Sequence, residues 1–161
     1  MTVAFLSGRA RRAGVALGAV SAGLLALSAC DKPTPIATVT VGTESVHTEA
    51  TSGCYDADGL KQSKAQECLQ KTGGKVVEVS LDDRIRFGVD PEIAENGWTL
   101  FINGEPAEPE PYKKTYRSIS ASAFFAGQAG GGPESLRIAV VETHEKTKKP
   151  VGIWHFELKK V

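Results

Sequence analysis

Residues 84–89 carry a strict alternation of side chains, which restricts the fold of this chain more than any other feature. On an extended strand, Ile85, Phe87 and Val89 would lie on one face and both arginines of the segment on the other. Residues 98–102 repeat the pattern, with a tryptophan, a leucine and an isoleucine facing inward. Strict period two is typical of a sheet with one buried face. The sequence therefore predicts sheets that cover an apolar core.

Further strand and turn signals recur along the chain at intervals typical of a β-sandwich. The other predicted strands are residues 36–41, 45–49, 75–81, 112–120, 136–141 and 152–158. The turns between them are predicted at residues 42–43, 82–83, 103–104 and 145–150. An edge or loop is expected for the proline-containing residues 105–111, a short turn or strand for 121–126, and a mobile loop for 127–132. We expect a single all-β domain, an immunoglobulin-like β-sandwich in outline, with a small barrel as the alternative.

The N-terminal segment has the pattern of an export signal. Three arginines within residues 9–12 precede an uncharged apolar run over residues 13–27, and small residues follow it. Residues 27–30 read Leu-Ser-Ala-Cys and resemble the lipobox of bacterial lipoproteins. The resemblance implies transfer of a diacylglyceryl group to the Cys30 sulfur, cleavage before Cys30, and acylation of the new amino terminus.

This interpretation divides the chain into a removed signal peptide (1–29), a lipidated tether (30–35) and a β-sandwich domain (36–161). A membrane-spanning helix needs about twenty apolar residues, and the run here is shorter and rich in Ala and Gly. An uncleaved membrane anchor and secretion without lipid are the two alternatives. The sequence leaves open whether export uses the general secretory or the twin-arginine pathway. Two acyl chains on one sulfur hold a protein stably, so we expect attachment to the extracytoplasmic face of the cell membrane.

The charge balance limits the partners. The chain has 19 basic and 19 acidic residues, and three of the arginines lie in the leader, so the mature part has a small acidic excess. It therefore lacks the basic surplus that attracts nucleic acid. The expected partners are the membrane, through the lipid on Cys30, and an unidentified protein of the cell envelope.

Two cysteines remain for the folded domain, Cys54 and Cys68. An even pair in an oxidising compartment favours a disulfide. The bridge would close a loop of about fifteen residues and contribute roughly 3 kcal/mol by constraining the unfolded chain. A redox or zinc pair is the alternative, but the spacing matches neither Cys-x-x-Cys nor a zinc cluster. We expect the bridge to hold one short helix or loop within residues 56–71.

No catalytic or metal-binding constellation is predicted, and no cofactor is expected. His47, His144 and His155 lack metal-ligand spacing; His155 is expected to face water beside an acidic neighbour, and His144 lies in a predicted turn. The glycines of residues 127–132 lack the lysine and Ser/Thr that complete a phosphate loop. Residues 56–59 open like a calcium loop, but a leucine and a lysine then stand where an oxygen donor and a glycine are needed.

Tyr112, Tyr116 and Arg117 are the candidate contact residues, because aromatic and basic side chains interleave around them as in surfaces that bind anionic polymers. On a single strand, however, the two tyrosines would share one face and Arg117 would lie on the other. A solvated edge strand blunted by lysines is therefore the favoured alternative. Trp98 and Trp154 stand in strand patterns and are expected to fill the core, with a surface contact as the alternative.

The chain as a whole resembles a family of small actinobacterial lipoproteins classed as domain of unknown function 2771. The resemblance covers nearly all 161 residues. It is carried by the lipobox at 27–30, the Cys54 and Cys68 pair, and residues 86–90, 97–98 and 152–156. It implies a location at the membrane and no particular activity, so no functional residue is transferred from it.

Two classes of function follow. The first is a non-catalytic binding or scaffolding module, with contacts made by loops such as residues 105–111 and 127–132. The alternative is an extracytoplasmic enzyme or a domain of the protease-inhibitor type, whose site assembles only in the fold. A cleft that holds a histidine against a carboxylate would favour catalysis, whereas a flat or aromatic loop patch would favour binding.

Overall fold

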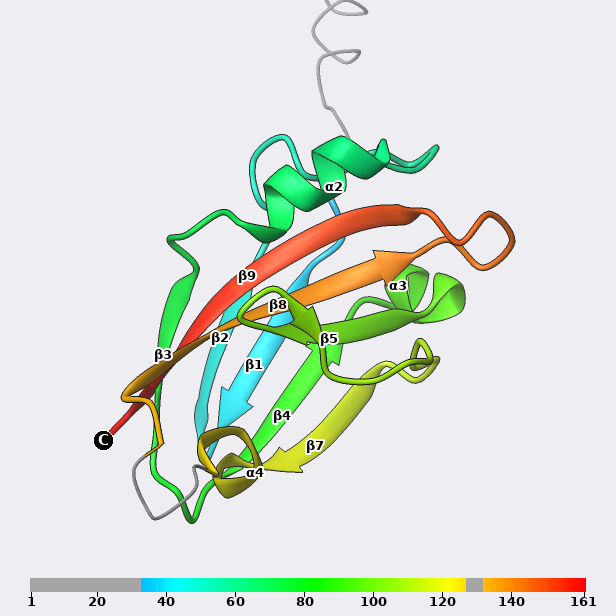
Figure 1. Ribbon diagram of the computed structural model, residues 1–161. Helices are drawn as coiled ribbons and strands as arrows, with labels where there is room; N and C mark the ends of the chain where they lie inside the picture. Colours follow the sequence, from blue (N-terminus) through cyan, green and yellow to red (C-terminus); the bar gives the residue numbers. More distant parts are fainter. Residues whose placement is uncertain (1–32, 127–131) are drawn as a thin grey trace, which may run out of the picture. The chain divides into compact units, whose positions relative to one another are not determined.

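A computed structural model describes residues 33–126 and 132–161, and the compact unit within it runs from Thr34 to Val161. This unit is mostly β-structure arranged in two sheets (Figure 1), which confirms the predicted two-sheet architecture. The signal segment, Cys30 and the glycines at 127–131 lie outside the described residues.

The first sheet has four antiparallel strands in the order β2-β1-β4-β7. Their bounds are Ala37–Val41 for β1, Glu44–Thr48 for β2, Arg84–Val89 for β4 and Tyr116–Ser120 for β7. On β4 the predicted alternation is confirmed, because its three inward side chains are buried and both arginines are exposed. Period two therefore aims the apolar face of this sheet at the interior.

The second sheet has five strands in the order β3-β9-β8-β5-β6. Their bounds are Lys75–Val79 for β3, Trp98–Ile102 for β5, Glu105–Pro106 for β6, Ser135–Thr143 for β8 and Pro150–Lys160 for β9. The β3–β9 pair is parallel, and the other pairs are antiparallel. The predicted hairpin turn at Asn103 and Gly104 is confirmed, with φ of 51° and 92° at the two residues.

The main core lies between the two sheets and contains both tryptophans. Trp98 is 1% exposed and Trp154 is 0% exposed, so the prediction that they fill the core is confirmed. Each indole N–H donates to a backbone carbonyl, Trp98 to Lys114 at 2.9 Å and Trp154 to Pro35 at 2.8 Å. Burial of both rings therefore leaves no indole donor unpaired.

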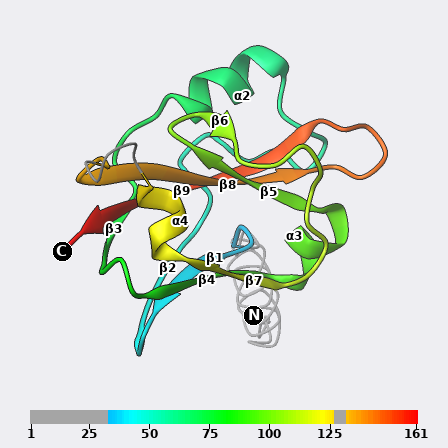
Figure 2. The same cartoon turned by 60° about the horizontal axis from the view of Figure 1, so that its bottom comes forward.

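A second apolar cluster covers the outer face of the five-stranded sheet. Helix α2 (Gln62–Leu69) lies across this face, as Figures 1 and 2 show, and the four-stranded sheet packs on the opposite side. The cluster consists of Cys54, Leu60, Ala65, Cys68, Ala139, Val141 and Ile153. The predicted helix and the predicted Cys54–Cys68 disulfide are confirmed. Strands β8 and β9 are thus buried on both faces where the helix covers them.

Two short helices differ from the sequence-based expectations. Helix α3 (Pro91–Asn96) was not predicted, although Asp90 before a proline at the first helical position and Gly97 after the helix are typical boundary signals. Residues Ala121–Phe125 form helix α4, where a short turn or strand was expected. Ala121 and Phe125 are buried there, because one turn of helix places both against the core.

The predicted strand over residues 112–120 is wrong in its first half, because the chain changes sheets within it. Tyr112 pairs with Trp98 of the five-stranded sheet, with backbone N–H···O distances of 3.0 and 2.7 Å. Strand β7 begins only at Tyr116 and pairs with β4 of the other sheet. Side chains on the two sides of this crossing therefore do not follow a single period of two.

The glycines in β4 and β9 allow a paired test of core packing. A Cβ atom on Gly152 would lie 2.4 Å from the Trp154 ring and 2.9 Å from the Tyr55 ring, whereas on Gly88 the nearest atom would be 3.8 Å away. We expect Gly152→Ala to lower the free energy of unfolding by about 1–3 kcal/mol through overpacking. Gly88→Ala, the control, should change it far less. Urea unfolding of both variants measures the difference, and equal losses would contradict this account.

Candidate functional site

A pocket of about 360 Å³ opens on the outer face of the five-stranded sheet, beside the C-terminal end of α2. On β9, Ile153 lies in the apolar cluster under the helix, and the next side chains on the same face are polar. The pocket therefore begins where the helix stops covering the strands. Its polar lining includes Lys71, Asn103, Ser135, Arg137, His155 and Glu157.

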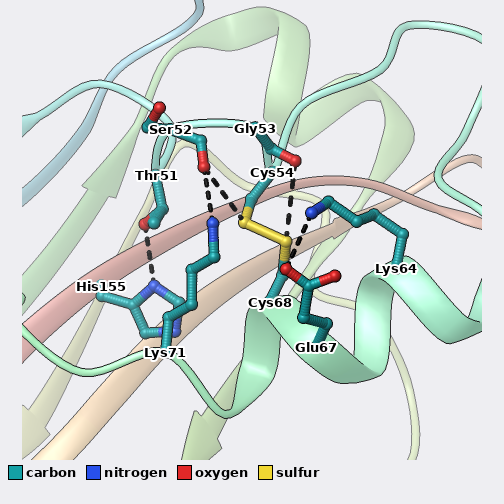
Figure 3. The surroundings of a disulfide bond; sticks show 9 residues. All are labelled: Thr51, Ser52, Gly53, Cys54, Lys64, Glu67, Cys68, Lys71 and His155. Carbon is teal, nitrogen blue, oxygen red and sulfur yellow. Dashed lines mark hydrogen bonds and ion pairs between the residues drawn. A yellow bond between two sulfur atoms is a disulfide. The ribbon is translucent and has the colours of Figure 1, made fainter.

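His155 is the most enclosed polar side chain of this lining, at 7% exposure. Its Nδ1 shares a 2.8 Å hydrogen bond with Thr51 Oγ1 (Figure 3), and its Nε2 is buried without a hydrogen-bond partner among the described residues. The expectation that His155 faces water is wrong. Residues 51–54 cover this part of β9, because the backbone of Ile153 bonds to Thr51 and to Cys54 at 2.9 and 3.0 Å.

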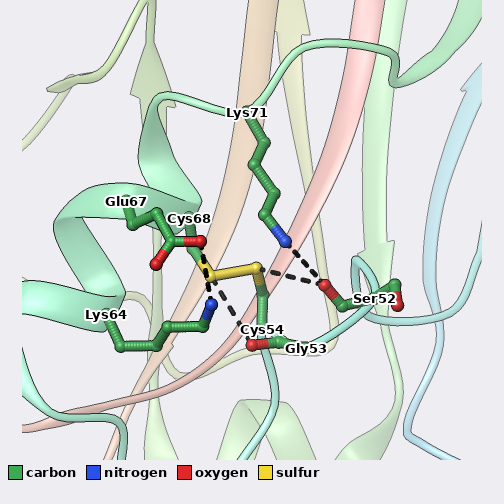
Figure 4. Close-up of polar contacts among 7 residues, drawn as sticks. All are labelled: Ser52, Gly53, Cys54, Lys64, Glu67, Cys68 and Lys71. Atoms are coloured by element: carbon green, nitrogen blue, oxygen red, sulfur yellow. Dashed lines mark hydrogen bonds and ion pairs between the residues drawn. A yellow bond between two sulfur atoms is a disulfide. The ribbon is translucent and has the colours of Figure 1, made fainter.

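The disulfide positions Lys71, which lines the pocket, and Thr51, the hydrogen-bond partner of His155. It joins Cys54, three residues after Thr51, to Cys68, three residues before Lys71. Lys71 Nζ donates to the Ser52 carbonyl at 2.7 Å, which ties the segment after α2 to the covering segment (Figure 4). The covalent link and this hydrogen bond thus hold the segments of Thr51 and Lys71 together beside β9.

Two cations shape the electrostatics of the pocket. Burial lowers the pKa of His155 from its ordinary value of 6.5, and the charges of Arg137 and Lys71 lower it further. Arg137 Nη1 lies 3.4 Å from the Gln70 carbonyl. Among the described residues, no carboxylate lies within 4.0 Å of either cation. Burial and the two cations therefore favour the neutral imidazole, while Glu157 stands opposite Arg137 in the β8–β9 register.

The Thr51–His155 pair has the separation of a nucleophile and its base. In a catalytic triad the second ring nitrogen is held by a carboxylate, which orients the imidazole and stabilises its charged form. Here that nitrogen, Nε2, has no partner in the described part of the chain, and two cations oppose protonation of the ring. Glu157 lines the pocket on the same strand without contacting the imidazole nitrogens. The pair therefore lacks, in the described residues, the second contact that completes a catalytic triad.

The predicted contact residues lie at the opposite edge of the sheets and do not join this pocket. Tyr112 packs edge-on against Trp98 with ring centroids 5.6 Å apart, and the Arg117 guanidinium lies 5.6 Å from the Tyr112 ring centroid. Arg117 also forms a two-pronged ion pair with Glu108, whose pKa the hydrogen bonds from Arg117 lower. Tyr116 is 65% exposed. Tyr112 and Arg117 therefore join the two sheets, and a contact role for the three residues stays a prediction.

The other residues considered for catalysis or metal binding lie apart from one another in the structure. His47 lies exposed on β2, and His144 Nδ1 accepts the Lys146 backbone N–H at 3.2 Å in the β8–β9 connection. Asp56 Oδ1 accepts the Asp58 backbone N–H at 3.0 Å, a local turn contact. Within residues 33–126 and 132–161, no three His, Cys, Asp or Glu side chains gather in a way that could hold a metal ion.

Glu142 is a buried acid that the sequence reasoning missed. It is 1% exposed, and its Oε1 accepts a hydrogen bond from Asn96 Nδ2 at 2.6 Å. Burial raises its pKa, the bond from Asn96 opposes this, and the charge of Glu92 raises it further. The sequence signal that could have revealed this buried acid is a glutamate at an inward-facing position of the apolar strand β8. The contact joins α3 to the five-stranded sheet and lies away from the His155 pocket.

Searches of family models, curated proteins and solved structures found no match to this chain. Among the described residues, no helix combines the length and the apolar character that crossing a membrane requires.

The buried histidine makes stability depend on pH. The unfolded chain binds a proton to His155 near the ordinary pKa of 6.5, whereas the folded pKa is lower, so stability is lost as pH falls through this window. We expect the melting temperature to fall between about pH 7.5 and about pH 5, and His155→Gln to flatten this part of the profile. The exposed His47→Gln is the control and should keep the wild-type slope. An unchanged slope in His155→Gln would contradict the assignment.

Proposed function

We propose that the chain is an extracytoplasmic lipoprotein whose domain acts as a non-catalytic binding module of the cell envelope. The lipobox-like residues 27–30 support the location and the anchor on Cys30. The resemblance to the lipoproteins of domain of unknown function 2771 points the same way. Because a lipid anchor of two chains on one sulfur is stable, the module would stay at the outer surface of the membrane.

The single observation that carries the binding function is the His155 pocket. Two cations and a buried neutral imidazole line one concavity, and its floor is formed by paired strands. Ligand sites of this kind place a few polar groups on a rigid framework. The polar groups are braced by the Cys54–Cys68 disulfide, which suits an oxidising compartment.

We also propose an immunoglobulin-like outline for the two sheets and a short tether between the lipid and the domain. Two packed sheets of four and five strands support an immunoglobulin-like outline, and the parallel β3–β9 pair is a departure from an antiparallel sandwich. The tether of residues 30–35 contains two prolines. At about 3.1 Å per extended residue, it would keep the domain within a few nanometres of the bilayer, within reach of other envelope proteins.

An extracytoplasmic enzyme or a domain of the protease-inhibitor type is the second candidate. The specific observation that favours catalysis is the 2.8 Å hydrogen bond between Thr51 Oγ1 and His155 Nδ1. The two flanking cations count against it, because a base that takes up a proton between them is destabilised.

The anchor is tested by Cys30→Ala in the native host. We expect an unprocessed precursor or release into the medium, because the sulfur that would carry the lipid is gone. The control is Ser28→Ala, which keeps a small residue before the cysteine and should be lipidated normally. Membrane fractionation and mass spectrometry of the mature N-terminus give the result. Normal processing and membrane attachment of Cys30→Ala would exclude the lipid anchor.

The binding role is tested by crosslinking on intact cells, followed by identification of co-purified envelope components. The matched control is the same chain with Lys71→Met and Arg137→Gln, which keeps the anchor and removes both cations of the pocket. We expect at least one component to be enriched with the wild-type chain over this variant. Equal recovery from both chains would contradict the capture of an envelope component through the pocket.

A further inference from the structure

We infer that the His155 pocket binds a small oxyanion, a carboxylate or phosphate group, between Lys71 and Arg137. This deepens the proposed binding function by naming the ligand chemistry. The two cations come from different segments: Lys71 follows α2, and Arg137 lies on β8. Both line the same pocket of about 360 Å³, so one bound group can contact both.

The two cations donate to neutral carbonyls, and one carboxylate of the pocket, Glu157, stands opposite Arg137 in the β8–β9 register, so the lining keeps a net positive charge. Lys71 Nζ donates to the Ser52 carbonyl at 2.7 Å, and Arg137 Nη1 lies 3.4 Å from the Gln70 carbonyl. These neutral acceptors fix where the side chains lie and leave further N–H donors on each. Charge-assisted hydrogen bonds from an ammonium and a guanidinium to an oxyanion are roughly twice as strong as neutral ones. An anionic ligand is therefore the partner that gains most from this pair.

The buried imidazole supplies a second, independent indication. In the tautomer in which Thr51 donates to Nδ1, Nε2 of His155 carries the proton and is a donor without an acceptor. Buried polar atoms are nearly always paired in native proteins, so this nitrogen would gain from a partner, which is an acceptor in this tautomer and a donor in the other. An oxyanion is an acceptor that Lys71 and Arg137 also attract, whereas both charges would repel a cationic ligand.

The rest of the lining limits the charge of the ligand. Glu157 adds one carboxylate to the pocket, so a polyanion would be repelled where a single oxyanion is accepted. Ser135 contributes a hydroxyl, and Asn103 contributes an amide whose Oδ1 accepts the Arg137 backbone N–H at 3.1 Å. That contact leaves the NH₂ of Asn103 as the donor end of its side chain. The lining thus offers neutral donors beside the cations, as selective anion sites do.

The test is a titration of the purified full chain in detergent with sodium phosphate and, separately, with sodium acetate, at constant ionic strength. We expect saturable binding of at least one anion, with a change in the ring resonances of His155. Lys71→Met and Arg137→Gln should each weaken that binding by about tenfold or more, and Arg137→Lys should restore most of it. Lys146→Met removes an exposed charge from the β8–β9 connection and should leave the affinity unchanged.

The outcomes separate the alternatives. Saturation by phosphate alone supports a phosphate ester as the natural group, and saturation by acetate alone supports a carboxylate. Saturation by neither anion in a chain that melts cooperatively would overturn the inference, as would equal weakening in Lys71→Met and Lys146→Met. The titration needs neither the lipid nor an envelope partner. A negative Cys30→Ala or crosslinking result would therefore leave it standing, and its own failure would leave the anchor untouched.

Discussion

The burial of strands β8 and β9 on both faces is the constraint on which the rest of the structure depends. On one face they pack against the four-stranded sheet through both tryptophans, and on the other they are covered by α2. Strands covered on both sides must be apolar along most of their length. Polar side chains appear on the outer face only beyond the helix end, and there His155 and Arg137 meet. The position of the candidate site is thus a consequence of where the helix stops.

The disulfide links this packing to the site. Without it, α2 and residues 51–54 would be held over β9 by one small apolar cluster and a few backbone hydrogen bonds. A bridge over about fifteen residues contributes roughly 3 kcal/mol in the chain-entropy estimate, a large share of the stability of a small domain. It also joins the segment of Thr51, which bonds to the imidazole, to the helix that precedes Lys71. The bridge therefore braces two of the segments that surround the pocket.

Patterns among neighbouring residues allowed much of the fold to be predicted. Contacts between residues far apart in the sequence could not be predicted. The alternation on β4, the hairpin at Asn103 and the helix near Cys68 each depend on neighbouring residues. The change of sheet after Tyr112 depends on pairing with a strand distant in sequence. The burial of His155 also depends on a distant contact, because Thr51, which bonds to the imidazole, lies about a hundred residues earlier in the chain. The site was missed because its members come from the segment after α2, from β8 and from β9, which no single sequence pattern connects.

The position of β9 in the second sheet has a consequence for the order in which the sheets can form. Strand β9 follows every other described strand in the chain, yet it lies between β3 and β8. Neither the parallel pair with β3 nor the long hairpin with β8 exists before residues 150–160 are synthesised. A chain lacking them exposes apolar side chains of both clusters and lacks the complete five-stranded sheet, whereas the four-stranded sheet needs none of these residues. Closure of the five-stranded sheet therefore waits for the last described strand and depends on contacts between residues far apart in sequence, which are slow to form.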